Sequence, residues 1–272
     1  TNNDDQVSND ANDEQLIITY EVLVLNTSDN NAGDSKPNYV SFQYRNGDDE
    51  DLTAKDTVTL SIQEPDLGLS TSMSPSGGNA SGMNTVTFNT YVFNQNTSNS
   101  TTAYNLSFSE DLPVGFLGTG AGANAPALVS ATYTADGSDV SACFEWGGDG
   151  NELLFDASNG GCTLDSLNPG DSISLVYTAV IDSLVDFNET VSNNPSAEAT
   201  SLAGGNGNTS SGGNTAGAAD ADDGERTGSA VNNTSGQAVN GLNASSSDNI
   251  VLIEPSLSKT GDTNLRLAIL LL

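Results

Sequence analysis

Two cysteines and a large excess of carboxylates are the residues of this chain that could take part in chemistry. Cys143 and Cys162 are the only cysteines, 36 acidic side chains stand against 6 basic ones, and there is no histidine. A chain without histidine has no Ser-His-Asp triad, no Cys-His pair and no histidine-ligated zinc. A glycosidase-type pair of carboxylates stays open, but no acidic residue is distinguished from the many surface acids. We therefore expect no enzymatic activity and no catalytic residues.

The two cysteines most simply form one disulfide, because no second cysteine pair or histidine is present to share a metal. The bond between Cys143 and Cys162 would close a loop through the glycine-rich segment 147–150. In the chain-entropy model, such a closure stabilises the fold by roughly 3 kcal/mol. A metal pair or a reactive thiol is the alternative. A disulfide implies an oxidising compartment, so we expect an extracellular or cell-surface location.

Three acidic segments, 29–34, 46–51 and 220–225, could hold calcium, which takes several oxygen ligands from a turning chain. None has the twelve-residue spacing of an EF-hand loop, and a solvated acidic loop is the alternative. Calcium is the only cofactor that we expect. The candidate ligands are Asp222, Asp223, Glu225, Asp29 and Asp34.

The formal net charge of −30 narrows the classes of partner. A surface this acidic repels nucleic acid and anionic membranes, and it favours solubility. The apolar tail, 265–272, is far too short to cross a bilayer. We therefore expect no nucleic-acid partner and no membrane insertion by this segment.

Apolar residues alternate along short segments, which predicts strands with one buried face. Val86, Phe88 and Val92 share a face of one segment, as do Tyr104, Leu106 and Phe108 of another and Val58, Leu60 and Ile62 of a third. Turn sequences such as Asp136-Gly137 separate these segments, and helical periodicity is absent. The segment 16–25 is apolar on both faces, which predicts a central strand. The pattern predicts an all-β sandwich.

The chain also repeats itself. The segment 61–70 returns at 251–258, with Glu64-Pro65 matching Glu254-Pro255 at an interval of 190 residues. The segments centred on Tyr20 and Tyr177 match at an interval of 157, so the second copy carries about 33 additional residues (190 − 157). The segment 204–228, with 8 glycines in 25 positions, is the candidate insertion. We predict a partial sandwich at 1–63, a complete sandwich at 64–253 and the opening strand of a further unit at 254–272.

Three motifs carry a family resemblance. The segments 93–96 (FNQN), 108–116 (FSEDLPVGF) and 167–173 (LNPGDSI) resemble, in order, the N-x-G, D-x-L-P-x-G and L-x-P-G-x-S elements of the conserved tandem repeat domain of prokaryotic surface proteins. The match covers 64–200 and, in part, 13–63. The resemblance implies an immunoglobulin-like sandwich without a catalytic site, strung in many copies along large cell-surface or secreted chains. Independently of the family, Pro113 predicts that a strand ends there at a sheet edge.

These observations favour a structural unit of an extracellular fibre, filament or stalk. The partial sandwich and the C-terminal segment look like complementary halves of one domain. The head of one molecule could therefore bury Leu267, Ile269 and Leu271 of the next by donor-strand complementation. Such a head-to-tail contact generates a filament. The partners would be copies of the chain or, if the chain is part of a longer array, neighbouring repeats. The alternative is a calcium-stabilised adhesin or ligand-binding module.

Overall fold

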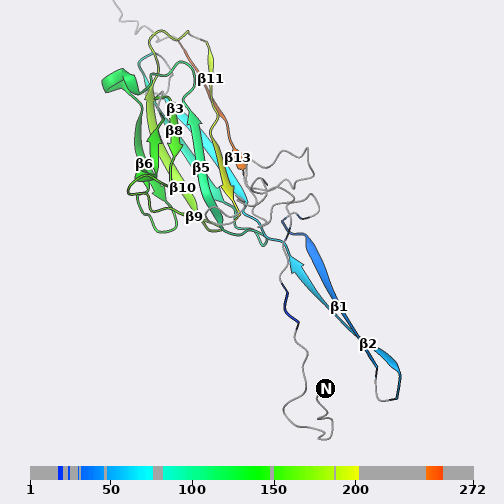
Figure 1. Ribbon diagram of the computed structural model, residues 1–272. Helices are drawn as coiled ribbons and strands as arrows, with labels where there is room; N and C mark the ends of the chain where they lie inside the picture. The colour runs from blue at the N-terminus through cyan, green and yellow to red at the C-terminus, as the bar shows by residue number, and fades with distance from the viewer. Residues whose placement is uncertain are drawn as a thin grey trace, which may run out of the picture.

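The computed structural model describes residues 18–20, 24, 30, 32–45, 48–75, 82–147, 150–186, 188–201 and 243–253. These residues form a β-sandwich and a long β-hairpin that projects from one end of it (Figure 1). Apart from the two short 3-10 turns Thr119–Asn124 (η2) and Ser141–Cys143 (η3), the regular elements among the described residues are strands. The predicted all-β fold is confirmed. Among the described residues, no helix is long and apolar enough to cross a membrane.

The sandwich consists of two antiparallel sheets. The first, the β4 sheet, has the order β3 (Leu67–Pro75), β4 (Thr85–Asn94), β10 (Ser172–Val180), β6 (Ala127–Tyr133). The second, the β5 sheet, has the order β13 (Asn243–Ser245), β12 (Ser196–Thr200), β5 (Ala103–Asp111), β8 (Glu152–Phe155), β7 (Phe144–Trp146), and β9 (Ser166–Leu167) also pairs with β5. A further two-stranded ladder joins β11 (Thr190–Asn193) to β14 (Asp248–Val251).

The core lies between the two sheets and is built by the alternation seen in the sequence. Val86 and Phe88 of β4 are fully buried, and Phe88 stacks on Tyr177 of β10 with ring centroids 4.8 Å apart. Leu106 and Phe108 of β5 close the core from the other sheet. Each buried side chain of this size contributes about 1.5–3 kcal/mol to folding through removal of apolar surface from water. The predicted buried faces of β4 and β5 are confirmed, whereas the third predicted face was wrong for Val58 and Leu60, which are exposed.

The Leu112-Pro113 segment ends a strand as predicted, but the prediction of a sheet edge was wrong. Strand β5 ends at Asp111 and lies between β12 and β8, in the middle of its sheet. The Leu112 amide still donates to the Asn151 carbonyl (2.7 Å), so the last backbone donor before the proline is satisfied. Pro113 follows the last paired residue and therefore removes no ladder bond, which allows a proline directly after a central strand.

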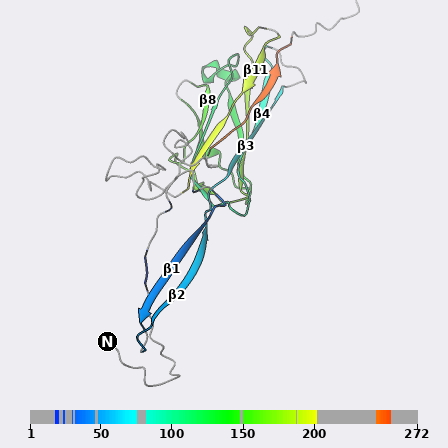
Figure 2. The ribbon, with the colours of Figure 1, turned by 90° about the vertical axis from the view of Figure 1, so that its right-hand side faces the viewer.

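The hairpin consists of β1 (Ser35–Arg45) and β2 (Asp51–Ser61), which pair along their whole length. It extends away from the sandwich in both views (Figures 1 and 2). Among the described residues, β1 and β2 pair with no strand of the sandwich. Most of the predicted strand at 16–25 and the segments 202–242 and 254–272 lie outside the described residues. The predicted domain boundaries stay a prediction.

Candidate functional site

The hairpin repeats, residue for residue, a ladder found in the complete sandwich. Ser35 pairs with Ser61 in the hairpin, and Thr190 pairs with Val251 in the sandwich, which gives shifts of 155 (190 − 35) and 190 (251 − 61). The same shifts relate the hairpin to the β12–β13 pairs, of which Ala197 with Ala244 is one. Their difference, 35 residues (190 − 155), falls between β12 and β13. This is close to the 33 additional residues expected from the sequence.

The backbone flanking the two ladders matches as well. The Gly33 amide donates to the Ile62 carbonyl (2.8 Å), and the Asn188 amide donates to the Leu252 carbonyl (2.6 Å). Gly33 and Asn188 both have positive φ, 87° and 67°. Since a non-glycine residue rarely adopts this conformation, the agreement indicates one local design used twice.

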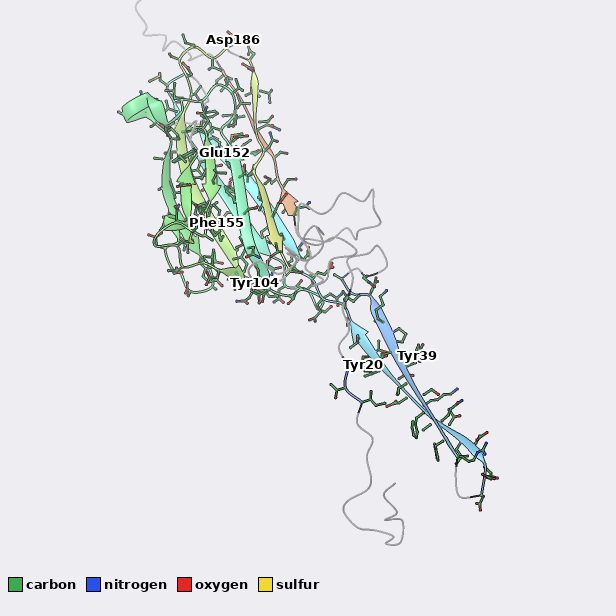
Figure 3. The ribbon with its side chains drawn as sticks, in the orientation of Figure 1. Tyr20, Tyr39, Tyr104, Glu152, Phe155 and Asp186 are labelled. Carbon is green, nitrogen blue, oxygen red and sulfur yellow. A yellow bond between two sulfur atoms is a disulfide. The ribbon has the colours of Figure 1, made fainter. Side chains whose placement is uncertain are left out.

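A tyrosine–asparagine contact recurs in both units. In the sandwich, the Asn193 side-chain amide donates a hydrogen bond to the Tyr177 hydroxyl (3.5 Å). In the hairpin, the Asn38 side-chain amide donates to the Tyr20 hydroxyl, and Figure 3 shows Tyr20 beside the hairpin. Asn38 corresponds to Asn193 by the shift of 155. The projecting hairpin is therefore built like one side of a sandwich.

One face of the hairpin is apolar and exposed. Val40, Phe42 and Tyr44 of β1 lie on this face with Val58 and Leu60 of β2, since residues opposite in an antiparallel pair point the same way. These side chains are 45–58% exposed, and the Phe42 and Tyr44 rings stack at 5.8 Å. We call these five residues the hairpin face. The opposite face is polar except for Tyr39 and Pro37.

The corresponding face in the sandwich is covered. Ala197 and Ala199, which correspond to Phe42 and Tyr44, are 2% exposed, and Ile250, which corresponds to Leu60, is 8% exposed. Strand β12 pairs with β5, while β3 of the other sheet lies against this ladder. The hairpin face thus corresponds to a face that is buried in the sandwich core. Among the described residues, no strand covers it.

The junction between the hairpin and the sandwich is built around Glu64. Its side chain is buried and accepts a hydrogen bond from the Ala32 amide (3.3 Å), while its own amide donates to the Asn99 carbonyl (3.0 Å). The Thr101 amide donates to the Glu64 carbonyl (3.1 Å). The Asn99 side chain lies against Gly33, where a Cβ atom would be 2.7 Å from Nδ2. These contacts join the end of the hairpin to one end of the sandwich.

A second group of polar residues is buried between the two sheets. Glu110 of β5 is fully buried beside Tyr177 and Asn193, and burial raises its pKa from 4.5 to about 8; the two polar neighbours lower it in part, although neither carboxyl oxygen lies within hydrogen-bonding geometry of a partner among the described residues. Burial and the neighbouring Glu110 carboxyl also raise the pKa of Tyr177. The Asn193 amide donates to Thr71 Oγ1 (3.1 Å), whose hydroxyl lies 3.0 Å from that of Thr90. Glu110 is therefore largely neutral at pH 7.

The disulfide lies at the edge of the sandwich. Cys143 and Cys162 are bonded and their Cα atoms are 4.5 Å apart, which confirms the predicted pairing. Cys143 is fully buried where η3 leads into β7. The bond ties this edge of the β5 sheet to the loop that leads into β9, and so closes a loop of the chain.

One of the five predicted metal ligands, Asp34, lies within the described residues. It directly precedes β1, and its carboxylate is 4.0 Å from Lys36 Nζ. The other four, Asp29, Asp222, Asp223 and Glu225, lie outside the described residues. Within the described ranges, no group of three or more potential metal ligands is present. The predicted assembly residues Leu267, Ile269 and Leu271 also lie outside these ranges. The calcium and assembly assignments stay predictions.

The outer face of the β5 sheet carries a depression that includes Phe155 and three acidic residues, Glu145, Asp156 and Glu198. Nearby, the Ser109 hydroxyl donates to the Glu152 carboxylate (2.7 Å); Figure 3 labels Glu152 and Phe155. The core residues Phe108 and Ala197 also line the depression, but Glu110 does not, so the two groups of acids are separate features.

Sequence reasoning missed Glu64, Glu110 and Asn193. Glu110 had a usable signal, because it shares a strand face with Leu106 and Phe108 at a spacing of two residues. Asn193 had a different signal in the sequence, since Asn38 occupies the equivalent position of the repeat, 155 residues earlier. Glu64 was recognised only as part of a repeated sequence, and its burial depends on the loop at 96–101, which no local pattern connects to it.

No known protein-family model matches the chain, and no curated protein shows significant sequence similarity to it. The family resemblance described above is thus not supported by a matching family model. Similarity to solved structures is distant. The fimbrial adhesin FimA of Actinomyces aligns over 50% of this chain and 47% of its own length, with 10% identity and a TM-score of 0.35.

Two further structures are similar to the same low degree. A variant of BcpA, the major pilin subunit of Bacillus cereus, aligns over 79% of this chain and 48% of its own length, with 11% identity and a TM-score of 0.34. AvmM, which catalyses a macrocyclization in alchivemycin A biosynthesis, aligns over 70% and 92%, with 9% identity and a TM-score of 0.33. The chain spans about half the length of FimA and BcpA. Similarity this distant carries no conclusion about activity or partners.

Proposed function

We propose that the chain is a non-enzymatic structural module of the cell surface, a unit of a fibre, filament or stalk in which sandwiches follow one another end to end. The observation that carries the proposal is the repeated ladder. The same paired strands, flanking bonds and tyrosine–asparagine contact occur on both sides of the Glu64 junction. Stacked repeats of one design span distance and present surface rather than build a single active site.

The chemistry of the chain supports an extracellular setting. The disulfide between Cys143 and Cys162 is a bond that persists in oxidising compartments. The net charge of −30 keeps neighbouring copies soluble at high local density. Copies of the chain, or neighbouring repeats of a longer chain, are the partners that we propose.

The predicted donor-strand mode of assembly belongs to this proposal. The tail that carries Leu267, Ile269 and Leu271 would pair with the incomplete sandwich of another copy. The contact joins two different surfaces, so it generates an open filament rather than a closed ring. The adhesin alternative stays a prediction, because the Gly-rich loop and the acidic segment 220–225 on which it depends lie outside the described residues.

Antibody labelling combined with electron microscopy tests this function. Antibodies raised against the sandwich should label the outside of intact cells, and the labelled material should be rods or fibres with a regular repeat. Permeabilised cells serve as the control for the total amount of protein. Label that appears only after permeabilisation, or that decorates only isolated globular particles, would contradict the proposal.

A further inference from the structure

We propose that the hairpin face is a docking surface for the segment 257–265 of a second copy of this chain. The segment would lie against β2 in the register that β3 has against β14 and its flanking residues in the complete sandwich. The inference rests on the proposed end-to-end assembly and specifies one contact in it. The internal repeat shows what covers the equivalent face within the same molecule.

In the complete sandwich, β3 is held to this ladder by three hydrogen bonds. The Thr71 amide donates to the Ser246 hydroxyl (3.2 Å), and the Met73 amide donates to the Asp248 carboxylate (2.6 Å). The Asn193 side chain donates to Thr71 Oγ1 (3.1 Å). Side chains of the ladder thus satisfy the backbone donors along the free edge of β3, which would otherwise be unpaired.

The hairpin keeps an acceptor for one of these three bonds, at Asp56; Val58 in place of Asp248 accepts no hydrogen bond, and Gly261 in place of Thr71 has no hydroxyl for Asn38 to donate to. By the shift of 190, Ser246 corresponds to Asp56 and Asp248 to Val58; by the shift of 155, Asn193 corresponds to Asn38. Asp56 therefore stands where an incoming strand presents a backbone amide. A carboxylate there accepts a charge-assisted hydrogen bond, which is stronger than the bond to a hydroxyl.

The same shift identifies the incoming strand. Strand β3, Leu67–Pro75, corresponds to 257–265, because Glu64-Pro65 recurs as Glu254-Pro255. Leu257 then matches Leu67, which is a buried core residue, and Gly261 matches Thr71, whose amide would meet Asp56. Leu267, Ile269 and Leu271 follow this strand and would extend the apolar contact.

The hairpin itself supplies the physical reason for a cover. A two-stranded hairpin alone is marginally stable in water, and contiguous exposed apolar side chains mark interaction sites. The hairpin face has large apolar side chains on both strands, whereas the opposite face has only Tyr39 and Pro37 among polar residues. The segment 257–265 follows β14, the last strand among the described residues, so a second copy could supply the matching strand and keep every described strand of its sandwich in place.

Cysteine trapping between two variants tests the register. Met73 and Asp248 touch in the sandwich, so Thr263→Cys in one molecule and Val58→Cys in another should be neighbours. The two native cysteines form a disulfide with each other, so they contribute no free thiol to the reaction. The matched control is Thr57→Cys, one residue along β2 on the polar face. Oxidation of an equimolar mixture should give the 58–263 linked peptide in about tenfold higher yield than the 57–263 peptide.

Equal yields of the two linked peptides, or none of either, would overturn the proposed register. Such a result would include the case in which a preceding unit of a longer chain covers the hairpin face instead. The cell-surface labelling experiment is independent of this result. Surface fibres without the 58–263 link would therefore reject the contact and leave the proposed function standing, whereas absence of surface label would reject the function.

A charge placed on the hairpin face provides a second measurement. Leu60→Asp should weaken self-association of the purified chain about tenfold, because a carboxylate would be buried in the contact. Thr59→Asp, on the polar face, should leave association unchanged. Both variants should keep the melting temperature of the sandwich, monitored through Trp146 in β7. Association of Leu60→Asp at the wild-type strength would overturn the proposal.

Discussion

The hairpin and the β11–β14 side of the sandwich are two copies of one design in opposite surroundings. Both have the same register, the same flanking bonds and the same tyrosine–asparagine contact. In the sandwich, β3 and β5 cover the ladder, whereas the hairpin face is exposed. Local pairing is therefore set by the repeat itself, whereas burial depends on what a neighbouring segment supplies.

The largest difference between the two regions should appear in the dependence of stability on pH. The folded sandwich raises the pKa of Glu110 from 4.5 to about 8, so between these values the unfolded chain releases a proton that the folded chain keeps. The stabilisation is therefore complete below pH 4.5 and is lost as pH rises through about 8. The total loss should be on the order of 5 kcal/mol at most. Denaturant unfolding followed by Trp146 fluorescence measures it.

Glu110→Gln is the matched control for this prediction, because glutamine stays neutral over the whole range. The pH dependence of the variant should be flatter than that of the wild type between pH 4.5 and about 8. Identical slopes for the two proteins would show that Glu110 is not the group that titrates.

Truncation of one aromatic ring in each region comes next in size. Phe88→Ala should destabilise the sandwich by about 4 kcal/mol, since it removes a fully buried ring and leaves a cavity. Phe42→Ala should change the stability of the monomeric chain by less than about 0.5 kcal/mol, because that ring is exposed. Urea unfolding at low protein concentration compares the two. A large effect of Phe42→Ala would mean that part of the same chain covers the hairpin face.

Loss of the disulfide should act on the sandwich alone. The double variant Cys143→Ser, Cys162→Ser should be less stable by about 3 kcal/mol, because the unfolded chain regains the entropy of the open loop. The Val58→Cys and Thr263→Cys pair can be placed in this background to ask whether the hairpin contact depends on it. Unchanged unfolding of the double variant would show that the bond is not formed in the native protein.

Substitution of the asparagine in the tyrosine–asparagine contact should also destabilise the sandwich more than the hairpin. Asn193→Ala should cost the sandwich about 2 kcal/mol, since it removes a buried donor to Thr71 and Tyr177. Asn38→Ala should change monomer stability by less than about 0.5 kcal/mol, because its partner Tyr20 is exposed. Thermal melts of both variants provide the measurement. Equal losses would show that the two contacts have the same surroundings.

Calcium should produce the smallest effect. If Asp34 and the other predicted ligands bind it, a calcium concentration equal to the dissociation constant adds about 0.4 kcal/mol by mass action. Melting temperatures in calcium chloride and in sodium chloride of equal ionic strength would separate binding from screening. The same melting temperature in both salts would leave these acids as solvated surface.

Much of the sandwich was predictable because its strands carry their own pattern. Val86, Phe88 and Val92 alternate with polar residues, and this alternation alone places them in the core. The cysteine pair was predictable because it had no other partner. Glu110 was not recognised, since an acidic residue in a strand becomes a core residue only when the opposite sheet encloses it. Whether the hairpin face is covered or exposed could not be predicted from its own residues, because the same ladder is covered in the sandwich and exposed in the hairpin.

Gly33 has a consequence for the serial order of units in an array. Its missing Cβ lets Asn99 of the next unit approach, because a Cβ there would lie 2.7 Å from Asn99 Nδ2. The corresponding residue at the far end of the sandwich is Asn188, which has a Cβ. A unit that docked there in the same way would need a shorter or turned side chain in place of Asn99. In the proposed array, successive junctions would then accept different units, so the residues at each junction would determine which unit can follow.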